Sequence, residues 1–188
     1  MPLFSPYKTA HPGYLASRVY TTFSGSPITS AAISAVDIIY MYPFILPRPI
    51  TFTKGIMRVQ TAGAGSSVKA GIYASSPVSV YPLGAPLYKD DTGVATTAST
   101  SDVDIALGAG TLRADTLYWA GAKFTGTLPI LWTAYLASKM MELCGALTTT
   151  PVGVLGYASA YASAMPTISE GASFTLPNAA APILFLAT

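Results

Sequence analysis

The chain has 188 residues, and only 18 of them are charged: ten Lys or Arg and eight Asp or Glu. The basic residues are scattered singly and the net charge is +2, which argues against nucleic-acid binding, because binders of phosphate concentrate positive charge. The longest apolar stretch, residues 128–147, is interrupted by Lys139 and Glu142 and is unsuited to crossing a membrane. A soluble monomer usually has about a quarter of its residues charged, so this surface is expected to be uncharged or covered by other protein.

The first 16 residues contain Pro2, Pro6 and Pro12 and show no apolar periodicity. We expect residues 1–16 to form an extended arm that becomes ordered by docking on a neighbour. Residues 17–188 are expected to form a single domain. The N-terminus lacks the basic start and apolar stretch of a signal peptide, so assembly in a cytoplasm is expected.

The first half of the chain predicts strands at residues 18–23, 37–46, 50–61 and 68–75. Gly55 is predicted to form a β-bulge. The segment 37–46 is apolar on both faces, which indicates that one face packs on the core and the other on a partner. The alternating residues are Ile38, Tyr40, Tyr42 and Phe44 on one face, and Ile39 and Met41 on the other.

The second half begins with a polar stretch, residues 76–101, predicted to be loop with short β pieces at 78–81 and 93–98. Residues 102–107 alternate clearly, with Val103, Ile105 and Leu107 facing inward. Further strands are predicted at 117–124, 152–161, 174–176 and 182–188, with a turn at 108–111; residues 133–143 are the best helix candidate or, equally, a strand pair. Turn signals every eight to twelve residues favour an all-β, antiparallel β-sandwich or jelly roll with at most one short helix.

Side chains suited to catalysis are scarce. His11 is the only histidine and Cys144 the only cysteine, so neither a Ser-His-Asp triad nor an ordinary zinc site is expected. The paired carboxylates Asp90/Asp91 and Asp102/Asp104 could bind a cation if loops converged; our interpretation is that they keep a sheet face soluble. We therefore expect no enzymatic activity, no cofactor and no metal.

Aromatic side chains are more numerous, with twelve Tyr, seven Phe and two Trp. Trp119 lies in the middle of a predicted strand and is expected in the core. The candidates for glycan or partner binding are Trp132, Tyr135, Tyr157 and Tyr161, because exposed aromatic rings stack on sugars and anchor interfaces.

Several short motifs resemble a β-sandwich module of tailed-bacteriophage virion proteins, of the tail fibre or spike type or the head fibre or decoration type. The resemblance spans roughly residues 13–182. It rests on a Tyr-x-x-Pro-Phe strand within residues 37–53, a Gly-Ile-Tyr strand within 69–74, the turn Leu107–Leu112, the Tyr-Trp pair ending at Trp119 and the late segment Leu176–Pro182.

The resemblance implies a non-enzymatic structural protein exposed on a virion, in either a head or a tail location. With the shortage of charge, it leads us to expect a homo-oligomer, in the first instance a trimer, that contacts other virion proteins through residues 1–16. The alternative function is a lectin-like module that recognises host polysaccharide. A glycan-degrading enzyme is a further alternative, disfavoured because the chain has two glutamates and no clear acid/base pair.

Overall fold

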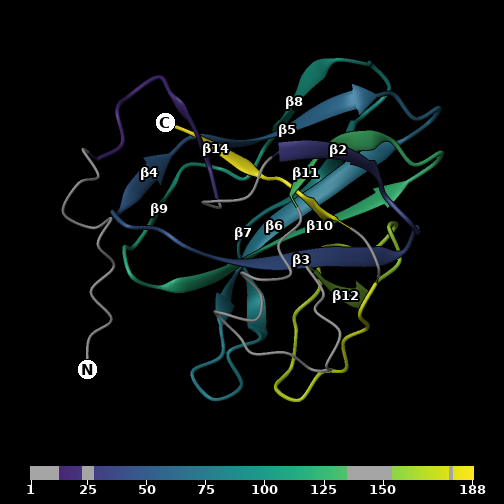
Figure 1. Cartoon of the computed structure of the whole chain (residues 1–188). Helices are drawn as coiled ribbons and strands as arrows, with labels where there is room; N and C mark the ends of the chain where they lie inside the picture. Colours follow the sequence, from purple (N-terminus) through teal and green to yellow (C-terminus); the bar gives the residue numbers. More distant parts are fainter. Residues whose placement is uncertain (1–12, 23–27, 135–153, 178–179) are drawn as a thin grey trace.

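The computed structural model describes residues 13–22, 28–134, 154–177 and 180–188 (Figure 1). These residues form antiparallel sheets packed against each other and contain no helix, so the predicted all-β sandwich is confirmed. Among the described residues, no helix has the length and apolar character that crossing a membrane requires.

The first sheet contains seven of the described strands. Its main order is β1-β14-β5-β11-β13, while β2 pairs with β11 and β8 pairs with β5. The bounds are β1 Val19–Thr21, β2 Ile28–Ala32, β5 Lys54–Thr61, β8 Ser101–Ile105, β11 Ile130–Ala134, β13 Ala181–Pro182 and β14 Phe185–Ala187. The last strand of the chain therefore lies between β1 and β5, inside the sheet.

The second sheet contains five of the described strands in the order β12-β3-β10-β6-β7. Its bounds are β3 Ile38–Ile45, β6 Ser67–Ser75, β7 Pro82–Ala95, β10 Leu117–Thr125 and β12 Leu155–Ala158. A separate pair, β4 (Ile50–Phe52) and β9 (Gly110–Leu112), lies beside the two sheets.

The main core lies between the two sheets. One face of β3 contributes Tyr40, Tyr42 and Phe44, which pack with inward residues of β5 such as Met57 and Val59. Valine, isoleucine and aromatic residues favour the pleated backbone because their side chains pack well on both sides of it. The predicted alternation at residues 102–107 is also confirmed, since Val103, Ile105 and Leu107 are buried and Asp102 and Asp104 are exposed.

The other face of β3 packs against a second apolar cluster formed within the same chain. Ile39 and Met41 join Trp119, Leu155 and Ile168 there. In Figure 1 the segment that follows β12, drawn in yellow, lies below β3, whereas β5 and β8 lie above it. The two apolar faces were correctly predicted, but residues 154–176 of this chain cover the second face, where a partner was expected.

The polar stretch 76–101 was predicted mainly as loop, and that prediction is wrong. Residues 82–95 form β7, the longest of the described strands, whereas residues 77–79 form a turn. β7 lies at the end of its sheet's strand order, where Pro and Gly are tolerated because fewer ladder hydrogen bonds are needed. Two irregularities in its pairing with β6 accommodate these residues.

Three smaller predictions also differ from the structure. Gly55 pairs continuously with neighbours on both sides, and the chain instead breaks at Thr53, between β4 and β5. The predicted turn at 108–111 contains the start of β9, and β2 lies in a stretch that carried no strand signal. Of the helix candidate 133–143, residues 133 and 134 are strand and the remainder lies outside the described residues.

The described end of the expected arm, residues 13–16, lies against its own chain. The ring of Tyr14 packs on that of Tyr20 at 4.6 Å between centroids. The backbone N–H of Leu15 donates to the Tyr20 hydroxyl (2.7 Å), and the Thr188 hydroxyl donates to the Leu15 carbonyl (2.6 Å). Residues 1–12 lie outside the described residues, so the arm and the boundary at residue 17 stay predictions.

Candidate functional site

The four aromatic candidates do not form one site. Trp132 lies on β11 in the first sheet, whereas Tyr157 lies on β12 and Tyr161 in the following loop, both beside the second sheet. Tyr135 lies outside the described residues. Trp119, predicted to be core, is fully buried.

Trp132 is half-buried on the outward face of the first sheet and lines an open groove of about 440 Å³. Thr29, Ser30 and Gln60 line the same groove. Antiparallel pairing brings these residues together, because Ser30 on β2 lies opposite Trp132 and β5 pairs with β11 on its other side. We call this feature the Trp132 groove.

Three neighbours fix the orientation of the Trp132 ring. Its Nε1–H donates to Oε1 of Gln60 at 3.3 Å, and the ring of Phe185 packs at 6.4 Å between centroids. The guanidinium of Arg58 lies 5.8 Å from the ring centroid, while its Nη1 donates to Asp102 at 3.0 Å. The indole is thus both accessible and held in one orientation.

Tyr157 has a different environment. Its ring packs on Phe174 at 5.7 Å between centroids, and it lies beside the second apolar cluster. This contact fits a packing role.

A buried lysine organises the loop of residues 159–166, which we call the lysine-anchored loop. Lys123 on β10 is 0% exposed. Its Nζ donates to the Ser159 hydroxyl (3.1 Å) and to the carbonyls of Ala160 (2.9 Å), Ser163 (2.9 Å) and Ala164 (3.0 Å). Burial lowers the pKa of Lys123, and the nearby positive charge of Lys69 lowers it further, against the opposing effect of two carboxylates.

A second lysine reaches the same loop. Lys69 on β6 lies directly opposite Lys123 in the strand pairing, and its Nζ donates to the Ser163 carbonyl at 3.1 Å. It also lies 4.9 Å from the ring centroid of Tyr161, so Tyr161 contacts a cation of its own chain. Burial raises the pKa of the Tyr161 hydroxyl, with a hydrogen bond from Ser67 opposing this effect.

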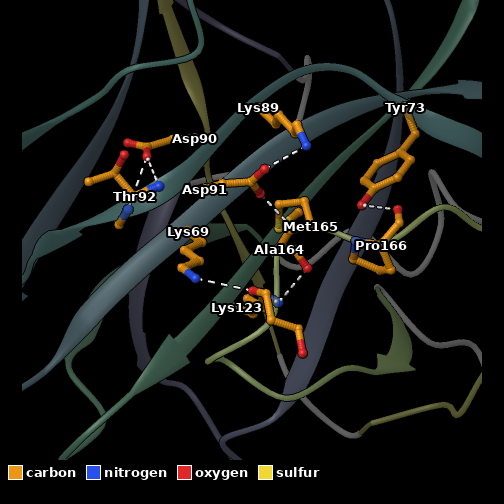
Figure 2. A network of polar contacts seen from close by, with 12 residues as sticks. Lys69, Tyr73, Lys89, Asp90, Asp91, Thr92, Lys123, Ala164, Met165 and Pro166 are labelled. Atoms are coloured by element: carbon orange, nitrogen blue, oxygen red, sulfur yellow. Dashed lines mark hydrogen bonds and ion pairs between the residues drawn. The ribbon is translucent and has the colours of Figure 1, made fainter.

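Carboxylates and a phenol complete the network (Figure 2). Asp91 accepts hydrogen bonds from the backbone N–H of Met165 (2.6 Å) and pairs with Lys89 (2.5 Å). Burial alone would raise the pKa of Asp91, but these hydrogen bonds and the neighbouring lysine charges hold it below its ordinary value. Tyr73 donates to the Pro166 carbonyl at 3.2 Å, and burial raises the pKa of its hydroxyl strongly.

The other paired carboxylates also have partners within the chain. Asp102 and Asp104 point outward from β8 and pair with Arg58 and Lys54 on β5. Asp90 is buried and accepts backbone hydrogen bonds from Thr92, Gly93 and Ala106. In the described part of the chain, no group of three or more His, Cys, Asp or Glu side chains is arranged to hold a metal ion.

Sequence reasoning missed the lysine pair and three of the four groove residues. Lys123 carried a signal, since it stands in an apolar strand next to Phe124 where a solvated lysine would be out of place. Gln60 carried a weaker one, because it is one of two amide side chains in the chain. Thr29 and Ser30 carried none.

No protein-family model matches the chain, and no curated protein matches it either.

Proposed function

We propose that the protein is a non-enzymatic structural component of a tailed-phage particle, exposed on the particle and self-associating as a trimer. The supporting observation is where the motifs of the resemblance lie in the fold. The Tyr-x-x-Pro-Phe, Tyr-Trp and Gly-Ile-Tyr segments occupy β3, β10 and β6, which are adjacent in the second sheet. The motifs that carry the resemblance therefore lie in three adjacent strands of one sheet of the sandwich.

Self-association is supported by the shortage of charge and by the surface near β1. Leu15 and Val19 are 62% and 53% exposed. β1 ends the strand order of the first sheet among the described residues, and a strand at such an edge can pair with another chain. An apolar edge of this kind fits a contact between subunits.

Labelling of intact particles tests the proposed location. Antibodies against the protein should decorate the head or the tail of purified particles in electron micrographs, and the protein should be found among the particle components by mass spectrometry. A protein that is made during infection but is absent from purified particles would contradict the proposal.

Sedimentation of the purified protein tests the proposed trimer. The double change Leu15→Ser and Val19→Ser should shift the mass towards that of a monomer, because it removes apolar side chains from the contact. Val78→Ser is the matched control, since Val78 is 85% exposed in a turn next to the second sheet. A stable wild-type monomer would rule out self-association.

A second candidate, recognition of host polysaccharide, is favoured by one feature, the Trp132 groove.

A further inference from the structure

We infer that the Trp132 groove is a binding site for a neutral saccharide. The inference goes beyond a structural role on a particle and does not depend on it. It selects one of the four aromatic candidates and assigns a chemical class of ligand to it.

The two tryptophans of the chain differ in exposure. Trp119 is fully buried and its Nε1–H donates to the Val80 carbonyl at 3.0 Å. Trp132 keeps part of its ring accessible in the groove. A pyranose ring presents a face of C–H groups that packs on an aromatic plane, so an accessible indole offers the apolar half of a sugar contact.

The indole of Trp132 is preorganised by contacts within the chain. The hydrogen bond to Gln60 and the packing on Phe185 hold the ring before any ligand arrives. A ring that is already ordered loses little conformational entropy on binding. This matters at an open groove, where few contacts are available to offset such a loss.

Polar side chains line the groove beside the Trp132 ring. Thr29 and Ser30 contribute hydroxyls, and Gln60 contributes an amide that can donate as well as accept. These groups match the hydroxyls at the edge of a sugar, which also donate and accept.

The charge of the described groove residues selects the ligand class. The four described residues that line the groove are uncharged, and the nearby guanidinium of Arg58 is paired with Asp102. Within the part of the chain that the structure describes, the lining therefore provides no charged side chain as a partner for an acidic sugar, and we assign the groove to neutral saccharides.

Calorimetric titration of the full-length protein tests the inference. The probes are hexasaccharides of glucose in α- and β-linkage and of mannose, with a hexamer of galacturonic acid as the acidic comparison. We expect saturable millimolar binding of at least one neutral hexamer. Trp132→Ala should weaken it about tenfold or more, the factor that corresponds to the loss of one aromatic contact.

Gln60→Ala provides a second variant, because Gln60 is exposed and its removal should leave the fold intact. It should also weaken binding, whereas the control Tyr157→Phe, on the other sheet, should bind as the wild type does. Circular dichroism confirms that each variant is folded.

Three results would overturn the inference: no binding of any neutral hexamer, binding of the acidic hexamer alone, or binding that survives Trp132→Ala and Gln60→Ala. Each of these would leave the particle location standing, because that location is tested by labelling. Conversely, absence from particles would leave a saccharide site that is measured on the purified protein.

Discussion

At the scale of single residues, Lys123 of the second sheet is unusual because it is a charged side chain in a buried position. Its ammonium is fully buried yet surrounded by one hydroxyl and three carbonyl oxygens of the lysine-anchored loop. A buried charge is tolerated only when such partners replace the lost water. Lys123 thereby connects the loop to β10 and helps to keep the second apolar cluster covered.

Replacing this lysine tests that role. Lys123→Met leaves the loop carbonyls without their donor. We expect urea denaturation to give a free energy of unfolding about 1–3 kcal/mol lower than that of the wild type. Acrylamide quenching of Trp119 should increase in a Trp132→Phe background, since the loop packs near that ring. Lys89→Met is the control, because Lys89 makes an exposed ion pair worth about 1 kcal/mol or less. Equal stability of Lys123→Met and wild type would refute the role.

Tyr42 connects the two ends of the chain within the main core. Its hydroxyl accepts the backbone N–H of Leu184 (2.8 Å) and pairs with the Thr22 hydroxyl (2.5 Å). Because Thr22 donates to the Leu184 carbonyl, Tyr42 is the donor to Thr22. Burial raises the pKa of Tyr42 from 10.0 to about 12.

This shift predicts a specific dependence of stability on pH. The folded state keeps its proton where the unfolded state loses it, so the contribution of Tyr42 is complete below pH 10 and is lost as the pH rises towards 12. The free energies of unfolding of the wild type and of Tyr42→Phe should be measured at about pH 8 and about pH 11. The difference between these two free energies should narrow by about 1.4 kcal/mol per pH unit above 10. A constant difference would contradict the assignment.

The candidate site was predictable from the sequence only in part. An aromatic side chain such as Trp132 can be selected as a candidate from its type and its place in an irregular region. Its partners Ser30 and Gln60 come from strands on either side of β11, and no local pattern indicates which strands pair. Tyr157 and Tyr161 were also selected by their residue type, but their rings make contacts within the chain. The ring of Tyr157 packs on Phe174, and the ring of Tyr161 contacts Lys69.

At the scale of elements, two turns meet at one end of the sandwich. The turn between β5 and β6 contacts the turn between β10 and β11, where the Thr127 N–H donates to the Ala64 carbonyl at 3.1 Å. A Cβ added at Gly63 would overlap the Thr127 carbonyl oxygen. Only glycine fits this contact without displacing one turn from the other.

Gly63→Ala is therefore expected to destabilise the protein by about 1–3 kcal/mol, the usual effect of overpacking. Thermal unfolding followed by circular dichroism measures the change. Ala64→Ser is the matched control, because Ala64 is exposed and adjacent. A Gly63→Ala variant as stable as the control would mean that the turns separate freely.

Strands whose own sequence shows an apolar alternation were predicted. Strands that form mainly because they pair with a neighbouring strand were missed. The alternation of Val103, Ile105 and Leu107 marks one buried face and can be read locally. β7 contains Pro, Gly and Asp and is defined by its pairing with β6. β9 and β2 likewise form through their partners, β4 and β11.

At the scale of the whole molecule, the fold is closed by its last residues. β14 pairs with β1 from the start of the chain and with β5 from its middle. Residues 183–187 are all apolar and all buried. The first sheet is therefore incomplete until the C-terminus has joined it, and pairing over such separations is slow.

Two changes test this closure. A chain that ends at residue 182 should show no cooperative unfolding transition, and Leu184→Ala should cost about 2–5 kcal/mol, as expected for a buried leucine. Val78→Ser at an exposed position should cost almost nothing and serves as the control. A cooperative transition in the shortened chain would show that β14 is dispensable.

Five of the basic side chains in the described part of the chain make polar contacts within the chain. Lys54, Arg58 and Lys89 pair with aspartates, and Lys69 and Lys123 bind the lysine-anchored loop. The small number of charged residues, 18 of 188, fits the proposed contacts between subunits.

The lysine-anchored loop is held by a positive charge that belongs to the protein itself. Loops built from carbonyl oxygens around a central positive charge are often held by a dissolved metal ion, and they loosen when a chelator or dilution removes that ion. Here the central charge is covalently attached to β10. A chelator or dilution therefore cannot remove the positive charge that holds this loop.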